Sequence, residues 1–285
     1  MRKDLLPLVQ AVLKGQYTID RELARGGSGR IFLAHDPDGK AVALKVLHPE
    51  LQVSVAADRF LREIKVLSGL DHPRITRLLD YGEADWVVYF VMEYEEGTTL
   101  RCHLDRVRQI PVADVVRLAE DLLDALGYAH DRGIVHRDVK PDNIVITDHG
   151  AMLLDFGIAR AIEVAGSQRL TRSGFTVGTS TYMSPEQAAA FKGLDHRSDI
   201  YSLGCVLFEC LAGKPPFSHH SEAVVLELHQ REPPPDLTKL RKEAKALTPV
   251  LAKALAKLPP DRWQSASDMK AAILQATQAG QTLPG

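Results

Sequence analysis

The sequence has few cysteines and no hydrophobic run long enough to cross a membrane. Its three cysteines, Cys102, Cys205 and Cys210, show no CxxC spacing, which excludes an obvious disulfide framework and fits a reducing, cytoplasmic compartment. The longest apolar run, YSLGCVLFECLAG at 201–213, falls short of the ~20 residues that a transmembrane helix needs. We therefore expect a cytoplasmic protein without a membrane span.

The chain also has little net charge. Its 35 Lys and Arg residues nearly balance 37 Asp and Glu residues, which leaves a formal net charge of −2. This balance argues against broad electrostatic binding to nucleic acid or to an anionic membrane. With 285 residues, of which 45% are hydrophobic, the chain is long enough for one large domain or two lobes.

The N-terminal stretch MRKDLLPLVQAVL superficially resembles a secretory signal. Asp4 and Gln10 interrupt its apolar run, and the following LKGQY lacks a small-residue cleavage site. An amphipathic helix over residues 1–16 is the better interpretation, with Asp4 as its N-cap and Gly15 as its stop. We expect this helix to dock on a folded domain.

The predicted secondary structure changes from mainly strand to mainly helix near residue 95. Before this point, strands are predicted at 17–23, 29–36, 41–47 and 86–94, together with a helix at 58–69 and a hairpin turn, DPDG, at 36–39. After it, helical patterns occur at 112–133, 199–212, 221–230, 244–257 and 265–278. This order predicts an α+β fold with two lobes, and clefts between lobes often bind ligands.

The octet HRDVKPDN at 136–143 places Asp138 between two cations, Arg137 and Lys140. Charged octets that contain proline are common in ordinary surface loops. The alternative is a site where Asp138 takes a proton, Lys140 neutralises developing negative charge and Asn143 holds a metal. The octet alone leaves both interpretations open.

Two features of the first third are equally ambiguous on their own. The glycine-rich LARGGSGRI at 23–31 could bring backbone N–H groups close to phosphates, or it could be a plain hairpin turn. Lys45 lies in the apolar run AVALKVL, where a cation is costly without an anionic partner. Glu63 on the following predicted helix could be that partner. Alternatively, Lys45 lies on an edge strand and reaches water.

A second acid, Asp155, belongs to the DFG at 155–157, twelve residues beyond Asn143. The oxygen atoms of an Asp and an Asn suit Mg²⁺, which keeps several waters and substrate phosphates as further ligands. Either residue alone is more often a turn former. The combination with the other motifs favours the metal.

The ordered set of a glycine loop, VALK, a helix glutamate, HRDVKPDN, DFG and SPE resembles a protein kinase, of the bacterial eukaryotic-type (Hanks-type) serine/threonine group. The resemblance covers roughly residues 17–275. It implies a bilobal fold with a small, mainly antiparallel β N-lobe that carries one key helix, and a larger, mainly α-helical C-lobe. The implied boundaries are an N-lobe at 17–93, a hinge at 94–99, a C-lobe at 100–275 and a tail at 276–285.

The resemblance further implies ATP beneath the glycine loop. Adenine would lie between Leu23, Ile31 and Ala43, with Val145 below, and Met92 would be the gatekeeper. Glu93 and Glu95 would offer backbone hydrogen bonds. The implied nucleotide-binding residues are Leu23, Ala24, Arg25, Gly26, Gly27, Ser28, Gly29, Arg30, Ile31, Ala43, Lys45, Met92, Glu93, Glu95 and Val145.

Catalytic roles follow from the same resemblance. Lys45, held by Glu63, would pair with the α- and β-phosphates of ATP. Asp138 would accept or orient the proton of the substrate hydroxyl, and Lys140 would steady the γ-phosphate. Asn143 and Asp155 would hold Mg²⁺. Lys140, with Thr179 of the GTS segment, fits the serine/threonine pattern, so the expected substrates are proteins with Ser or Thr.

The resemblance also predicts regulatory and scaffolding residues. Arg137, joined by Arg160, would bind a phosphate on the activation segment, where the candidate sites are Thr171, Ser173 and Thr176. We expect phosphorylation there in trans, between two molecules of a transient homodimer, to activate the protein. Glu186 and Arg262 would form a buried ion pair, and Asp199 would hold the backbone of the catalytic loop.

Two departures and two rivals qualify this interpretation. Ala24 replaces the first glycine of the usual loop, which puts loop flexibility and ATP affinity in question. Thr99 stands where some kinases carry a glutamate, so a preference for arginine-flanked substrates is not expected.

The rivals are a pseudokinase scaffold and a small-molecule phosphotransferase. Many relatives continue into a membrane span and a sensor domain; because this chain ends at Gly285, we expect partners or localisation to control it.

Overall fold

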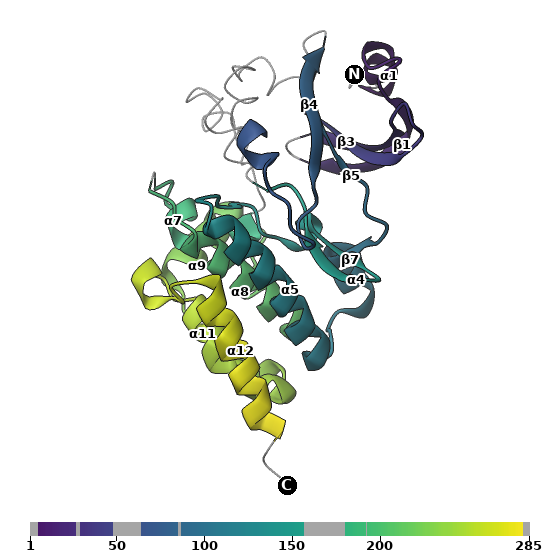
Figure 1. Cartoon of the computed structure of the whole chain (residues 1–285). Helices are drawn as coiled ribbons and strands as arrows, with labels where there is room; N and C mark the ends of the chain where they lie inside the picture. The colour runs from purple at the N-terminus through teal and green to yellow at the C-terminus, as the bar shows by residue number, and fades with distance from the viewer. Residues whose placement is uncertain are drawn as a thin grey trace. The chain divides into compact units, whose positions relative to one another are not determined.

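The computed structural model describes residues 5–26, 29–47, 64–84, 87–156, 180–191 and 193–281 (Figure 1). The chain divides into two compact units. Among the described residues, the first unit comprises those up to 72 together with 76–96, and the second comprises 73–75, 97–156 and those from 180 onward. No helix in these described ranges is long and apolar enough to cross a membrane.

The first unit is built on a five-stranded antiparallel sheet with the order β1-β2-β3-β5-β4. The strands are β1 (Thr18–Gly26), β2 (Gly29–His35), β3 (Ala41–Leu47), β4 (Leu78–Ala84) and β5 (Val87–Glu93). The hairpin turn predicted between β2 and β3 is confirmed. The carbonyl of Asp36 accepts the N–H of Gly39 at 3.0 Å, and Gly39 adopts φ +82°, a conformation that favours glycine.

The N-terminal helix α1 (Leu5–Val12) packs on one face of this sheet (Figure 1). Val9 and Leu13 are fully buried in a cluster with apolar strand residues, among them Phe32, Ala34, Leu44, Val46 and Val91. Beyond the helix, Gly15 turns the chain with φ +86°. The hydroxyl of Tyr17 then donates to Asp80 of β4 at 2.8 Å. The helix therefore docks on the sheet of its own chain; the N-cap predicted at Asp4 lies outside the described residues.

The second unit is mainly helical (Figure 1). Its helices are α4 (Leu100–Val107), α5 (Val112–His130), α7 (Pro185–Ala188), α8 (Arg197–Ala212), α9 (Glu222–Arg231), α10 (Leu237–Leu240), α11 (Thr248–Ala254) and α12 (Ala266–Gln281), with 3-10 turns η1 (Pro141–Asn143), η3 (Ser180–Tyr182), η4 (Lys242–Leu247) and η5 (Pro259–Asp261). Every residue of α8 from Ser198 to Leu211 is buried. A helix that is covered on all sides forms the centre of its unit, and α5, α10, α11 and η3 pack on this one.

A small antiparallel sheet completes the second unit. It has the order β6-β7-β8, formed by β6 (Thr98–Thr99), β7 (Ile144–Thr147) and β8 (Gly150–Leu153). The hairpin of β7 and β8 pairs Ile144 with Leu153. This hairpin carries the predicted catalytic loop before its first strand and Asp155 after its second.

Three predicted boundaries differ from the observed ones. Residues 73–75 belong to the second unit and not to the predicted N-lobe, because Arg74 pairs with Asp121 of α5 (Nε to Oδ1, 2.9 Å) and its carbonyl accepts the N–H of Leu153. The helix predicted at 244–257 divides into η4 and α11, since Pro249 starts a new helix. Residues 276–281, expected in a tail, continue α12.

Candidate functional site

Strand register gathers the predicted adenine and phosphate contacts of the first unit on one face of its sheet. Ile31 lies opposite Lys45, and Ala43 lies opposite Met92. Ala43 and Lys45 are two residues apart and therefore point to the same side of β3, whereas Leu44 between them points into the apolar cluster under α1. The sheet thus has one face for its core with α1 and another for these four residues.

Lys45 is buried, with 6% of its surface exposed. Its strand β3 lies between β2 and β5, so the alternative of an edge-strand lysine that reaches water is wrong. The ammonium Nζ lies 5.6 Å from the ring centroid of Phe90. A buried cation among apolar strands suits an anionic ligand such as a phosphate. The predicted partner Glu63 lies outside the described residues.

The glycine loop connects β1 and β2. Gly26 pairs with Gly29 across the hairpin, while Gly27 and Ser28 lie outside the described residues. A Cβ atom at Gly29 would lie 2.2 Å from the carbonyl oxygen of Val46, so no side chain fits there. Glycine at position 29 is therefore required by the close approach of β2 to β3.

The other predicted loop residues lie in β1 and β2, where the register shifts at Leu23 between Glu22 and Ala24. Ala24 is exposed and pairs with Ile31, so its methyl group is accommodated in the strand. Arg25 donates to the Glu22 carboxylate at 3.1 Å, and the guanidinium of the buried Arg30 lies 3.6 Å from the same carboxylate. These two arginines are thus engaged within the hairpin. Leu23 is half-buried in β1.

The predicted hinge continues from β5 into the second unit. The N–H of Glu93 donates to the carbonyl of Arg77 at 3.0 Å, so this group is committed to the sheet and the Glu93 carbonyl is the group that could serve adenine. Glu95 is half-buried. Thr99 has a local role, because its hydroxyl caps α4 by accepting the N–H of Cys102 at 3.2 Å.

In the second unit, the residues singled out in the octet are brought together. The Oδ2 atom of Asp138 lies 2.7 Å from Nζ of Lys140 and 2.9 Å from Nδ2 of Asn143. Asn143 also donates to the backbone carbonyl of Asp138 at 2.8 Å. The Asp138 side chain is about one-fifth exposed. Val145, the predicted lower contact of adenine, is buried in β7 just beyond.

Asp199 of α8 holds the backbone of this loop, as predicted. Its carboxylate accepts the N–H groups of His136 and Arg137, both at 2.8 Å, and Nε2 of His130 at 2.8 Å. Burial alone would raise the pKa of Asp199, but the hydrogen bond and charge of His130 outweigh it and hold the pKa below its ordinary value. The loop therefore rests on a buried, ionised carboxylate.

The ring of His136 fixes the backbone on both sides of the octet. Its Nε2 atom lies 2.8 Å from the carbonyl of Leu154, and its Nδ1 atom accepts the N–H of Asp138 at 3.2 Å. A ring that donates at Nε2 and accepts at Nδ1 is the neutral tautomer. His136 also packs on Phe156 of the DFG segment, with ring centroids 4.6 Å apart.

Asn143 and Asp155 lie at the same end of the β7–β8 hairpin, because the carbonyl of Asn143 accepts the N–H of Leu154 at 2.9 Å. Asp155 adopts φ +61°, a strained conformation for a residue with a side chain. Among the described residues, no group of three or more His, Cys, Asp and Glu could hold a metal. The oxygens of Asn143 and Asp155 fit Mg²⁺, which draws its other ligands from water and phosphate.

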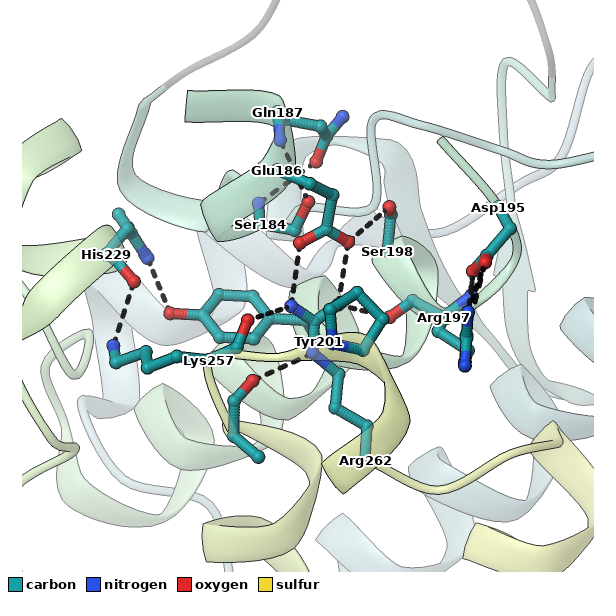
Figure 2. Close-up of polar contacts among 12 residues, drawn as sticks. Ser184, Glu186, Gln187, Asp195, Arg197, Ser198, Tyr201, His229, Lys257 and Arg262 are labelled. Carbon is teal, nitrogen blue, oxygen red and sulfur yellow. Dashed lines mark hydrogen bonds and ion pairs between the residues drawn. The ribbon is translucent and has the colours of Figure 1, made fainter. Parts of the chain in front are cut away.

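In the same unit, the predicted pair of Glu186 and Arg262 is present (Figure 2). The guanidinium makes two hydrogen bonds of 2.7 Å to the carboxylate, and Ser198 adds a third at 2.6 Å. Burial alone would raise the pKa of Glu186, but Arg262 outweighs it and lowers the pKa. The Arg262 side chain has no exposed surface, so the pair is a structural anchor.

Two polar residues near this anchor, the buried His229 and the half-buried Gln187, were not predicted from the sequence. Nδ1 of His229 lies 2.9 Å from the hydroxyl of Tyr201 (Figure 2). Its Nε2 atom lies 3.0 Å from the carbonyl of Thr181. Gln187 donates through Nε2 to the carbonyl of Arg137 at 2.8 Å. The only sequence signal at Gln187 is the pattern S-x-x-Q, which indicates the start of a helix.

Several predicted residues fall outside the described ranges and stay predictions. They are Gly27, Ser28, Glu63, Arg160, Thr171, Ser173, Thr176 and Thr179.

Comparison with known proteins agrees with this arrangement. A family described as the protein kinase domain matches residues 17–273. The serine/threonine-protein kinase PknB of Mycobacterium leprae is 40% identical over 271 residues, which cover 92% of this chain and 43% of that protein. The serine/threonine-protein kinase pkn3 of Myxococcus xanthus is 38% identical over 270 residues, which cover 90% and 49%. The chain thus spans less than half the length of these curated relatives.

A solved structure with a similar fold is the kinase domain of Mycobacterium tuberculosis PknI, determined as a mutant. The two chains superpose with a TM-score of 0.74 at 32% sequence identity. The match covers 92% of this chain and 96% of the PknI chain.

Proposed function

The chain belongs to the protein kinase family, and we propose that it is a serine/threonine kinase that transfers the γ-phosphoryl group of ATP to hydroxyl groups of proteins. One observation carries the proposal most directly. The carboxylate of Asp138 is held by Lys140 at 2.7 Å and by Asn143 at 2.9 Å. An acid oriented by two donors, one of them a cation, suits the transfer of a phosphoryl group to a hydroxyl.

In the proposed step, the substrate hydroxyl oxygen forms a bond to the γ-phosphorus while the bond from that phosphorus to the β–γ bridging oxygen breaks. Asp138 orients the hydroxyl and receives its proton. Lys140 neutralises negative charge that develops on the transferred group. Lys45 binds the α- and β-phosphates from the face of the sheet that it shares with Ile31, Ala43 and Met92.

Mg²⁺, when bound, supplies charge neutralisation at the phosphates. Asn143 and Asp155 are the residues that would hold it. Asn143 donates through Nδ2 to Asp138, so its amide oxygen would be the atom that holds the metal.

The test is incubation of the purified protein with Mg²⁺, ATP and a protein acceptor, followed by phosphosite mapping. Asp138→Asn should reduce the rate by ~10² to 10⁴, because the base is lost. Asp142→Asn, an exposed acid of the same octet, is the matched control and should keep full activity. Phosphate on a small-molecule acceptor alone would indicate a small-molecule phosphotransferase. ATP binding without transfer by the wild type would indicate a scaffold.

The proposal includes self-activation through the segment that carries Thr171, Ser173 and Thr176. A phosphate there adds about −1.5 to −2 charge, which Arg137 could bind. Mixing wild type with a tagged Asp138→Asn chain should place phosphate on the tagged chain, as transfer in trans requires. A triple variant, Thr171→Ala, Ser173→Ala, Thr176→Ala, tests this part of the proposal. Full activity of this variant toward an exogenous protein would contradict self-activation through the segment.

A further inference from the structure

Gln187 connects the start of α7 to the catalytic loop. Its Oε1 atom accepts the N–H of Ser184 at 3.0 Å, and its own N–H donates to the Ser184 hydroxyl at 3.3 Å, which closes a capping box (Figure 2). Its Nε2 atom donates to the carbonyl of Arg137 at 2.8 Å. Both ends of one amide are therefore used, one for the helix and one for the loop 50 residues earlier.

The carbonyl that Gln187 contacts belongs to the peptide group between Arg137 and Asp138. The N–H of this same peptide group donates to Nδ1 of His136 at 3.2 Å. Arg137 adopts φ +68°, the left-handed region, where a residue with a side chain persists only if its surroundings hold it. Rotation of this peptide group would break the bond to Gln187 and the bond to His136 together.

We infer that Gln187 is a positioning residue for phosphoryl transfer: it locks the 137–138 peptide group and thereby aims the Asp138 carboxylate. This inference rests on the proposed function. The neighbouring N–H of Arg137 is bound by Asp199 at 2.8 Å, so Asp199 holds the backbone on one side of Arg137 and Gln187 holds it on the other. The bond to the Arg137 carbonyl requires a hydrogen-bond donor at Nε2 of Gln187. The capping box does not require that donor, because it uses Oε1 and the backbone N–H.

Substitutions at Gln187 can therefore test its positioning role and its helix-capping role separately. In Gln187→Glu, one carboxylate oxygen can still accept the N–H of Ser184, so the capping box is kept. The other oxygen, when ionised, faces the Arg137 carbonyl and repels it. When the introduced acid is protonated, it regains a donor that can bind the carbonyl. Gln187→Met removes both side-chain bonds and adds no titratable group.

The experiment compares kcat, the KM for ATP and Tm of wild type, Gln187→Glu and Gln187→Met. At neutral pH we expect kcat of Gln187→Glu to fall about 10- to 100-fold, as small misplacement of a reacting group does, with KM for ATP and Tm unchanged. As pH falls, the ratio of its kcat to the wild-type kcat should rise, while the Gln187→Met ratio stays flat. Gln109→Glu, which exchanges another amide that donates to a backbone carbonyl at 3.2 Å, is the matched control and should show neither effect.

Gln187→Glu with wild-type kcat at neutral pH would overturn the inference. A loss of kcat that does not recover on acidification would also overturn it, because capping or packing would then explain the loss. If Gln187→Met fails to fold, Gln187→Glu decides alone. Absence of turnover by the wild type is a separate result, which would refute the proposed kinase activity.

Discussion

Between α1 and the first sheet, the buried side chains are apolar, with Val9, Leu13 and Phe32 at the centre. Around α8 of the second unit, Asp199, Glu209 and Arg262 are buried instead, together with polar residues. The described part of the first unit does bury two cations, Arg30 and Lys45, but both lie outside the α1 cluster.

Glu209 illustrates the second arrangement. It accepts from Arg101 of α4 at 2.8 Å and from the hydroxyl of Tyr182. Burial, reinforced by the Glu209 charge, raises the pKa of Tyr182. Apolar packing tolerates changes that conserve volume, whereas a buried ion pair is costly to break because it leaves a charge unpaired. The two units should therefore respond to different kinds of substitution.

Trp263 allows the second unit to be followed by fluorescence. It belongs to that unit and donates to the carbonyl of Val250 at 3.0 Å. A Trp86→Phe chain leaves Trp263 as the one tryptophan of the sequence and therefore reports on the second unit.

The largest effect is expected from Arg262→Met. It leaves the Glu186 carboxylate buried without its cation, which typically costs about 3–5 kcal/mol. Urea unfolding followed by Trp263 fluorescence should show this loss in the second unit. Lys270→Met breaks a more exposed pair with Asp124 (2.7 Å) and should cost below about 1 kcal/mol. Equal effects of the two substitutions would contradict the special role assigned to the buried pair.

A somewhat smaller effect is expected from Leu13→Ala. Removal of this fully buried side chain should cost about 2–5 kcal/mol through lost burial and a residual cavity. Urea unfolding followed by far-UV circular dichroism measures it. Gln10→Ala, an exposed change on α1, should stay within about 0.5 kcal/mol. Unaltered stability in the Leu13 variant would mean that α1 contributes little to the first unit.

The smallest effect is expected from His229, and it lowers stability only at acidic pH. Burial lowers the pKa of His229 from 6.5 to about 4. Between these two values the unfolded chain binds a proton that the folded chain excludes, so the free energy of unfolding should decrease as pH falls through this window. The full shift corresponds to about 3 kcal/mol.

This loss should appear in the second unit and should be absent from a His229→Gln variant. His219→Gln, an exposed histidine, is the control and should retain it. Asp199 and Glu186, whose pKa values are lowered from 3.8 and 4.5, begin to lose their contributions as pH falls toward those ordinary values, so the upper part of the window reports on His229. A His229→Gln profile identical to wild type would refute the assignment.

Sequence patterns predicted the elements whose signals are local. The hairpin turn at 36–39 depends on Asp36 and Gly39 themselves, and the helix predicted from 112 has its own apolar period, so α5 was found. Strand β4 was missed, because LLDYGEA shows no clean alternation and none of its residues is fully buried. Its place is set by pairing with β5.

The site divides in the same way. Asp138, Lys140 and Asn143 lie within one octet, so their meeting could be predicted. Gln187 and His229 bind backbone carbonyls 50 and 48 residues away, and nothing in their own neighbourhoods specifies those partners. Tertiary packing alone determines such contacts.

The two faces of the first sheet also limit how the gene can change length. Side chains alternate along β3, so insertion or deletion of one residue before Lys45 would exchange the faces for every residue beyond it. Lys45 would then turn into the apolar cluster beneath α1, and Leu44 or Val46 would take its place toward the ligand. Related genes should therefore vary in length at the 36–39 turn and keep the spacing within β3 fixed.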